Sequence, residues 1–129
     1  MSSTQQQLHS KFKIFTGPLG SDLSLGTLGA DVAAFAVSAK AAAKSIGVEY
    51  LEKTRTLVVT LGYRDDEAAY PIELHTVRLG TTATLEAPEL ERLEKRMSEE
   101  ASKLAGVICH ELFITEKGDF AMVLMTAKL

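Results

Sequence analysis

Patterns of apolar and polar residues divide most of the chain into predicted strands and helices. Residues 11–16 alternate between charged and apolar side chains, as in a half-buried strand. Residues 56–63 alternate Thr56, Val58 and Thr60 with Leu57, Val59 and Leu61, whereas 107–115 and 120–127 are nearly continuous apolar runs. A short turn separates these last two runs, and Gly118 can supply the positive φ that such a turn needs. We therefore expect four strands here, the last two forming a hairpin.

Two further strands are predicted with less regular patterns. The first is short, at 48–52, and is followed by a turn at 53–55. The second covers 70–80, but its apolar positions change parity along the strand. The four positions concerned are Ile72, Leu74, Val77 and Leu79. A β-bulge near His75 would bring all four to one face of the sheet.

Two helices are predicted, each ending at a glycine. An alanine-rich segment beginning at Asp31 has apolar residues three and four apart, and Gly47 fits a left-handed helix end. A second helix is predicted from 87 to 106, with Pro88 in its first turn and a Leu, Met and Ala stripe along one side. The glycine-rich segment 17–29 before the first helix lacks a phosphate-loop motif, so a flexible connection is favoured over an anion site at Gly26 and Gly29.

The order of elements predicts an α+β domain with the sequence β-α-β-β-β-α-β-β. Both helices are expected on one face of a mainly antiparallel sheet of five to six strands, an order compatible with a ferredoxin-like layout. The residues show no internal repeat and no interior linker. We therefore expect one domain at 11–129, preceded by a flexible polar tail at 1–10.

Composition and charge exclude several classes of protein. The chain has 129 residues, and 14 basic residues against 17 acidic ones give a net charge of −3, which argues against a nucleic-acid binder. No apolar run is long enough to span a membrane, and the first ten residues do not resemble a signal peptide. The single cysteine, Cys109, excludes an intrachain disulfide. We expect a cytoplasmic protein without a metal or cofactor.

The acidic segment Asp65-Asp66-Glu67, between two predicted strands, is the first candidate site. Adjacent carboxylates can bind a hard cation, but these three lack the spacing and the turn glycine of a calcium loop. Charged loop tips also keep proteins soluble. A solvated turn is therefore favoured over a metal site.

The histidines supply the other candidates. In a strand, Cys109 and Glu111 share one face and His110 points to the other, so the three cannot form a single catalytic group. Cys109 is expected to be a small buried hydrophobe, and His110 to be shielded within the core. Glu73 and His75 share a face and could begin an acid–base or metal site, although no third ligand is evident.

Two functions from different classes remain. The favoured one is a self-associating homodimer that binds a small-molecule or protein ligand, because the hairpin strands are apolar on both parities and would leave an uncovered sheet face. The residues proposed for that interface are Val58, Cys109, Phe113, Val123 and Met125. The alternative is a small enzyme with a site assembled from separate strands, using His75, His110, Glu111 and Asp66. A pocket shared by these last residues would favour the enzyme.

Overall fold

The computed structural model describes residues 10–20, 25–82, 84–115 and 117–128, and it confirms the α+β class and the order of elements. All but the last residue of the predicted tail lie outside the described residues. The strands are β1 (Lys11–Pro18), β2 (Ala42–Leu51), β3 (Thr56–Arg64), β4 (Ile72–Thr81), β5 (Val107–Ile114) and β6 (Asp119–Ala127). The helices are α1 (Thr27–Ser38) and α2 (Ala87–Ser102).

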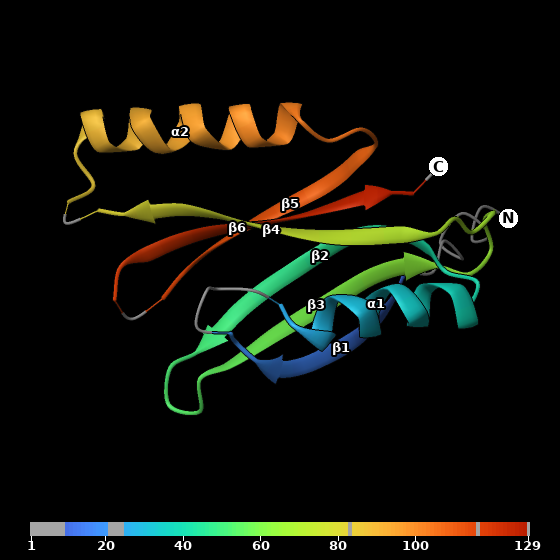
Figure 1. The fold of residues 1–129 in the computed structure, drawn as a ribbon. Helices are drawn as coiled ribbons and strands as arrows, with labels where there is room; N and C mark the ends of the chain where they lie inside the picture. The colour runs from blue at the N-terminus through green and yellow to red at the C-terminus, as the bar shows by residue number, and fades with distance from the viewer. Residues whose placement is uncertain (1–9, 21–24, 83, 116, 129) are drawn as a thin grey trace, which may run out of the picture.

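The six strands form two antiparallel sheets instead of the single sheet expected from the sequence. Sheet A has the order β1-β3-β2, and sheet B has the order β4-β6-β5. A single ferredoxin-like sheet is therefore not formed. The sheets lie one above the other in Figure 1, with β2 of sheet A close to β5 of sheet B.

The two halves of the chain repeat one architecture, which the residue pattern does not reveal. Each half has the order β-α-β-β, and in each the third strand is central. The second strand of each half also has a β-bulge near its start, between Ala43 and Ser45 in β2 and between Val107 and Cys109 in β5. The expectation of no internal repeat is therefore wrong for the topology. The sequence does not show this repeat because equivalent positions carry different side chains.

Helix α1 packs against the face of sheet A that is turned toward sheet B. Phe35 of α1 makes edge-to-face contacts with Phe15 of β1 and Tyr63 of β3, at centroid distances of 5.7 and 5.3 Å. The main core fills the space between the sheets and includes Val32 of α1, Val59 of β3 and Val123 of β6, all fully buried. Helix α1 thus closes one side of the space between the sheets.

Helix α2 covers the opposite face of sheet B, so the two helices do not share a sheet face as expected. A second, smaller core joins Leu93 of α2 to four residues of sheet B, namely Leu79, Phe120, Met122 and Leu124. The guanidinium of Arg96 also donates to the carbonyl of Arg78 on β4 at 3.3 Å. The resulting order, from top to bottom of Figure 1, is α2, sheet B, then sheet A with α1 beside it.

The parity change in β4 follows from its position between the two cores. Ile72 and Leu74 pack into the main core, whereas Val77 and Leu79 pack into the core under α2. The bulge that we expected near His75 lies instead between Arg78 and Gly80. All four apolar residues are shielded without sharing a face, because β4 is covered on both sides.

Helix α1 ends at Ser38, nine residues before the predicted glycine, Gly47. The N–H of Lys40 donates to the carbonyl of Val37 at 3.2 Å, and the N–H of Ala41 donates to the carbonyl of Ala36 at 2.9 Å. These two bonds form a Schellman motif, in which Lys40 has a φ of 50° at the position that usually carries glycine. Residues 42–51, of which 42–47 were predicted to be helical, therefore form strand β2.

Candidate functional site

The acidic segment after β3 is a surface turn in which each carboxylate has a basic partner. The Lys11 ammonium lies 2.6 Å from Asp65, and the Lys44 ammonium lies 2.6 Å from Glu67. Arg64 donates from Nε to Asp66 at 2.8 Å and lies 3.2 Å from Glu67. The bases come from β1, β2 and β3, so the turn ties the three strands of sheet A together at one end.

Protonation in this turn follows from the same pairs. A hydrogen bond from the Lys11 ammonium, and its positive charge, lower the pKa of Asp65, and the same contact raises the pKa of Lys11. The hydrogen bond to Glu67 likewise raises the pKa of Lys44. These ionic pairs are exposed and each contributes little to stability. They do compete with any cation for the carboxylate oxygens.

No group of three or more His, Cys, Asp or Glu side chains that could hold a metal ion occurs within 10–20, 25–82, 84–115 and 117–128. Asp66 is bound to Arg64 and lies in the turn beyond sheet A, whereas the two described histidines lie on sheet B. The candidate residues of the enzyme hypothesis are therefore divided between two sheets.

His75 forms a small polar cluster at the end of sheet B. Its Nε2 lies 3.4 Å from a carboxylate oxygen of Glu73 and 3.1 Å from the hydroxyl oxygen of Thr126, which is buried. A nucleophile–base–acid relay needs the hydroxyl and the carboxylate on different ring nitrogens. Both partners of His75 lie at the same nitrogen, so this cluster cannot activate Thr126 in that way.

His110 is exposed, and the prediction that the core shields it is wrong. It does point away from Cys109 and Glu111, as the strand alternation predicted, because it shares the α2 side of sheet B with His75. Both histidines pair in register with Leu124, one from each neighbouring strand. Their backbones are therefore two strand spacings apart, roughly 10 Å. Helix α2 covers the β4 and β6 part of this face and leaves His110 uncovered.

Cys109 faces the main core near the backbone of Ile46 in β2. Burial raises the pKa of its thiol, and the nearby Glu111 carboxylate adds to this effect. A thiol that stays protonated at neutral pH is a poor nucleophile. Cys109 is therefore suited to packing and not to catalysis.

The face that we predicted as an interface is largely inside the molecule. Phe113, Val123 and Met125 are buried between the sheets, and Cys109 lies at the edge of the same core. The prediction rested on both helices covering one side of one sheet. Because the strands form two stacked sheets, these side chains are covered by sheet A and α1. Val58 alone lies on an outward face.

The outward face is that of sheet A, on the side away from α1. Phe12 and Ile14 of β1 are 66% and 63% exposed there, beside Val58 and Thr60 of β3. The Phe12 ring lies over Gly62, where an added Cβ would come within 3.4 Å of the ring. Phe12 and Ile14 thus point away from α1, whereas the Phe15 ring contacts Phe35 of α1.

The parity of β1 was ambiguous because both of its faces carry phenylalanine. The available signal was Gly17, which shares the parity of Phe15 and allows Leu28 of α1 to approach closely. That parity also carries Lys13, whose ammonium lies 5.8 Å from the centre of the Phe35 ring. A lysine can lie along an apolar face and still reach water.

Comparison with known proteins gives no relative from which a function could be inferred. The chain matches no protein-family model, and no curated protein sequence and no solved structure matches it. Neither of the described helices is long and apolar enough to cross a membrane.

Proposed function

We propose that this chain is a self-associating module that forms a homodimer through the outer face of sheet A. The observation that carries the proposal is the internal repetition of the fold. In sheet B, the face away from its own helix α2 is covered by α1 and sheet A. In sheet A, the equivalent face away from α1 carries Phe12, Ile14 and Val58, with no helix or sheet of the described chain upon it.

The chemistry of this face supports a protein partner. Its three strands contribute mainly Thr, Gly, Ser and apolar side chains, and Glu49 is the charged residue in the middle of β2. Sheet faces that meet water normally alternate with charged and polar residues. A weakly charged face with protruding Phe and Ile side chains is typical of an interaction surface.

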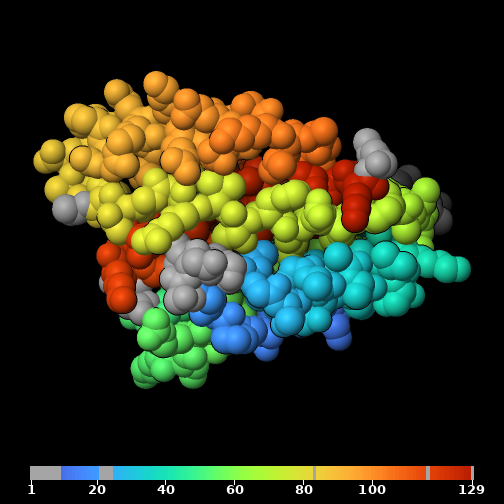
Figure 2. Space-filling model, viewed as in Figure 1, coloured from blue at the N-terminus to red at the C-terminus, as the bar shows by residue number. Residues whose placement is uncertain are grey.

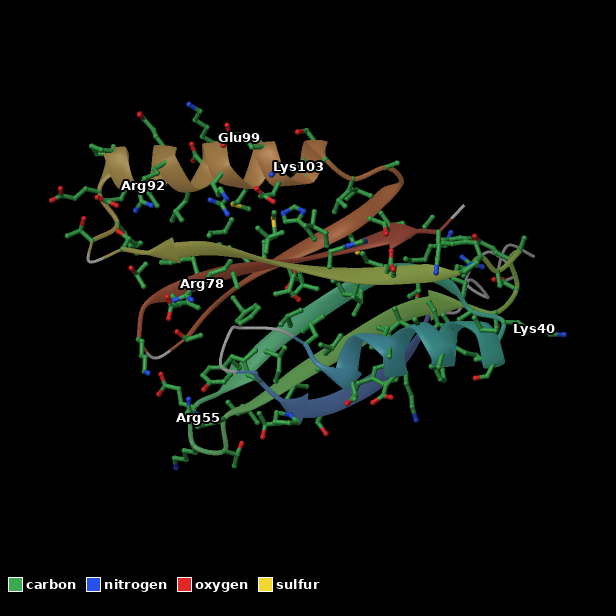
Figure 3. All side chains as sticks on the ribbon, viewed as in Figure 1. Lys40, Arg55, Arg78, Arg92, Glu99 and Lys103 are labelled. Carbon is green, nitrogen blue, oxygen red and sulfur yellow. The ribbon has the colours of Figure 1, made fainter. Side chains whose placement is uncertain are left out.

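A second copy of the chain fits this face better in a two-fold arrangement than in a continuing stack. In a continuing stack, the outer side of α2 of one copy would lie on the outer face of sheet A of the next copy. This would repeat between copies the way in which sheet A lies on sheet B within one chain. The exposed side of α2 carries Glu91, Glu94, Lys95, Glu99 and Lys103 (Figure 3 labels two of these residues). Burying those charges is unfavourable, so closed pairing of two sheet A faces is favoured.

Pairing of the β1 edges is a less suitable alternative. Lys11 and Lys13 lie along β1, and an antiparallel pair of β1 strands would bring the lysines of two copies together. Lysines on edge strands are a common protection against such pairing. The face of sheet A is therefore the proposed contact, and not its edge.

The size of the face sets the expected affinity. Eight-residue strands in a three-stranded sheet give a surface of roughly 26 by 14 Å. This is smaller than the roughly 800 Å² per partner of a standard stable interface. An interface of this size is typical of weak association, and we therefore expect a reversible dimer.

Sedimentation equilibrium over a wide concentration range tests the proposal. The mass is expected to rise from that of the 13.9 kDa chain toward twice that value. Ile14→Lys should hold the protein as a monomer, whereas Leu85→Lys is a matched control because both side chains are 63% exposed. A wild-type protein that stays monomeric at millimolar concentration, or a dimer unaffected by Ile14→Lys, would disprove the proposed interface.

A further inference from the structure

The groove between β4 and α1 is a second surface that the proposed dimer leaves open. Within the described sheets, β4 pairs with β6 alone, so one edge of its backbone has no strand partner. Helix α1 runs alongside, as the blue-to-cyan and yellow-green regions of Figure 2 show. An edge strand with a neighbouring helix is the arrangement that accepts an added strand in several peptide-binding domains.

Small residues on α1 leave space beside this edge. The groove has a volume of about 550 Å³, and its helix wall consists of Gly26, Gly29, Ala30 and Ala33. Its other wall is β4, which contributes Ile72, Leu74, Thr76 and Arg78 from the parity that faces α1 and Glu73 from the opposite parity. The groove therefore lies beside the open edge of β4, mainly on its α1 side. A smaller hollow of about 200 Å³ continues between Val37 and the segment 69–71.

We propose that this groove binds an extended, acidic peptide segment of a partner protein as an additional strand on β4. Backbone hydrogen bonds to the free edge would hold the segment in register. Side chains of one parity would rest on the Gly26, Ala30 and Ala33 side of α1, where small or branched apolar residues fit. Side chains of the other parity would face solvent.

The charges around the groove favour acidic residues at those solvent-facing positions. Among the described residues, Arg78 and Lys128 line the groove and Lys40 lines the hollow beside it, against Glu73 as the described acid. Arg78 is already bound to Asp119 at 3.0 Å through one nitrogen, but a guanidinium has five N–H donors. The carboxylate of Glu73 lies 3.4 Å from Nε2 of His75. The groove therefore attracts negative charge.

The length of the edge limits the segment. Seven residues of β4, from Ile72 to Arg78, span roughly 20 Å at about 3.3 Å per residue. A segment of about six residues matches this length. Proline within the segment would be excluded at positions where its N–H must donate to β4.

A designed hexapeptide that alternates Val with Asp or Glu is the probe for this proposal. Amide NMR of the labelled protein should show shifts concentrated in 72–78 and in α1 when the peptide is added. The same peptide N-methylated at alternate residues lacks the backbone donors and should not bind. A peptide with Lys in place of the acids should bind at least about tenfold more weakly, equivalent to 1.4 kcal/mol.

A matched pair of variants locates the site on α1. Ala30→Phe fills the groove and should weaken peptide binding at least about tenfold. Ala34→Phe changes another exposed alanine of α1 that does not line the groove and should have little effect. Both positions are on the surface of α1, so neither variant is expected to disturb the fold.

Four results would overturn the proposal. They are absence of binding at millimolar peptide, equal binding of the N-methylated peptide, shifts confined to the outer face of sheet A, and equal effects of Ala30→Phe and Ala34→Phe.

A second experiment uses decanoate, a fatty acid, in place of the peptide. NMR shifts of residues 72–78 with decanoate but not with the peptide would overturn the peptide proposal and assign the groove to an amphiphilic acid. Loss of self-association in Ala30→Phe would assign it to a second copy of the chain.

Discussion

Phe12 and Leu74 occupy equivalent positions in the two β-α-β-β units, yet their surroundings differ. Phe12 pairs with Gly62 and Leu74 pairs with Met125, in each case beside the bulge of the neighbouring second strand. Leu74 lies against Gly29 of α1, whereas Phe12 is 66% exposed. One unit therefore shows how this type of face is covered, and the other unit presents the same face uncovered.

Replacing Val123 by Lys is expected to prevent folding. Val123 is fully buried between the sheets, and an unpaired ammonium there would cost several kcal/mol, comparable with the whole stability of a small domain. Ile14→Lys, on the outer face of sheet A, should fold normally. Circular dichroism during urea titration compares the two variants. A folded Val123→Lys protein would contradict the placement of this residue in the core.

Lys40→Gly is expected to stabilise the protein by about 0.5–1 kcal/mol, because glycine adopts a positive φ without steric strain. The greater loss of backbone entropy by glycine on folding limits this gain. Lys40 is exposed and its φ is 50° at the end of α1. Urea unfolding measures the change. Ala34→Gly, within the exposed side of the same helix, is the control and should lose about 0.5–1 kcal/mol. Destabilisation by Lys40→Gly would contradict the observed helix end.

The contact between Lys11 and Asp65 is expected to contribute to stability only above acidic pH. The contact lowers the pKa of Asp65 in the folded protein below the unfolded value of about 3.9. Its contribution is therefore present above that unfolded value and is lost as the pH falls through the folded pKa. Carboxyl NMR titration should show a higher pKa for Asp65 in Lys11→Gln. An unchanged pKa would show that the ion pair does not persist in solution.

Adding magnesium, calcium or manganese is expected to leave the melting temperature unchanged. Each carboxylate of the turn after β3 already has a Lys or Arg partner. In the part of the chain that the structure describes, no group of three or more His, Cys, Asp or Glu side chains could hold a metal ion. A bound ion at about a hundred times its dissociation constant would add roughly 2.7 kcal/mol. A rise of several degrees that disappears in Asp66→Ala would establish a metal site.

The order of elements could be predicted from local patterns, but the layering of the sheets could not. Strand alternation and turn glycines are properties of short segments, and they gave the correct hairpin at Gly118, whose φ is 82°. Which sheet a strand joins depends on contacts between distant segments. The parity change at Leu74 was the one local sign of two cores, and we interpreted it as a bulge.

The end of α1 could not be predicted from the sequence, because the helix ends at a left-handed backbone conformation and not at a residue type that usually ends helices. Lys40 adopts the left-handed conformation without glycine, and the alanines that follow it are good helix formers. Ala41, Ala42 and Ala43 are fully buried, so tertiary packing decides their state against local propensity. The exposure of His110 was missed for a related reason, since α2 covers only part of its sheet.

Strand β6 gives the protein a particular dependence on the order of its synthesis. Every residue from Asp119 to Thr126 is buried, and alternate side chains complete the main core and the core under α2. Neither core can close before this strand is present, and β6 follows the other five described strands along the chain. A ribosome adding about 5–20 residues per second therefore leaves β4 without its central partner for several seconds, whereas β1, β2 and β3 can already pair with one another. During that interval the apolar side chains that will form the two cores are exposed, and exposed apolar surface favours aggregation.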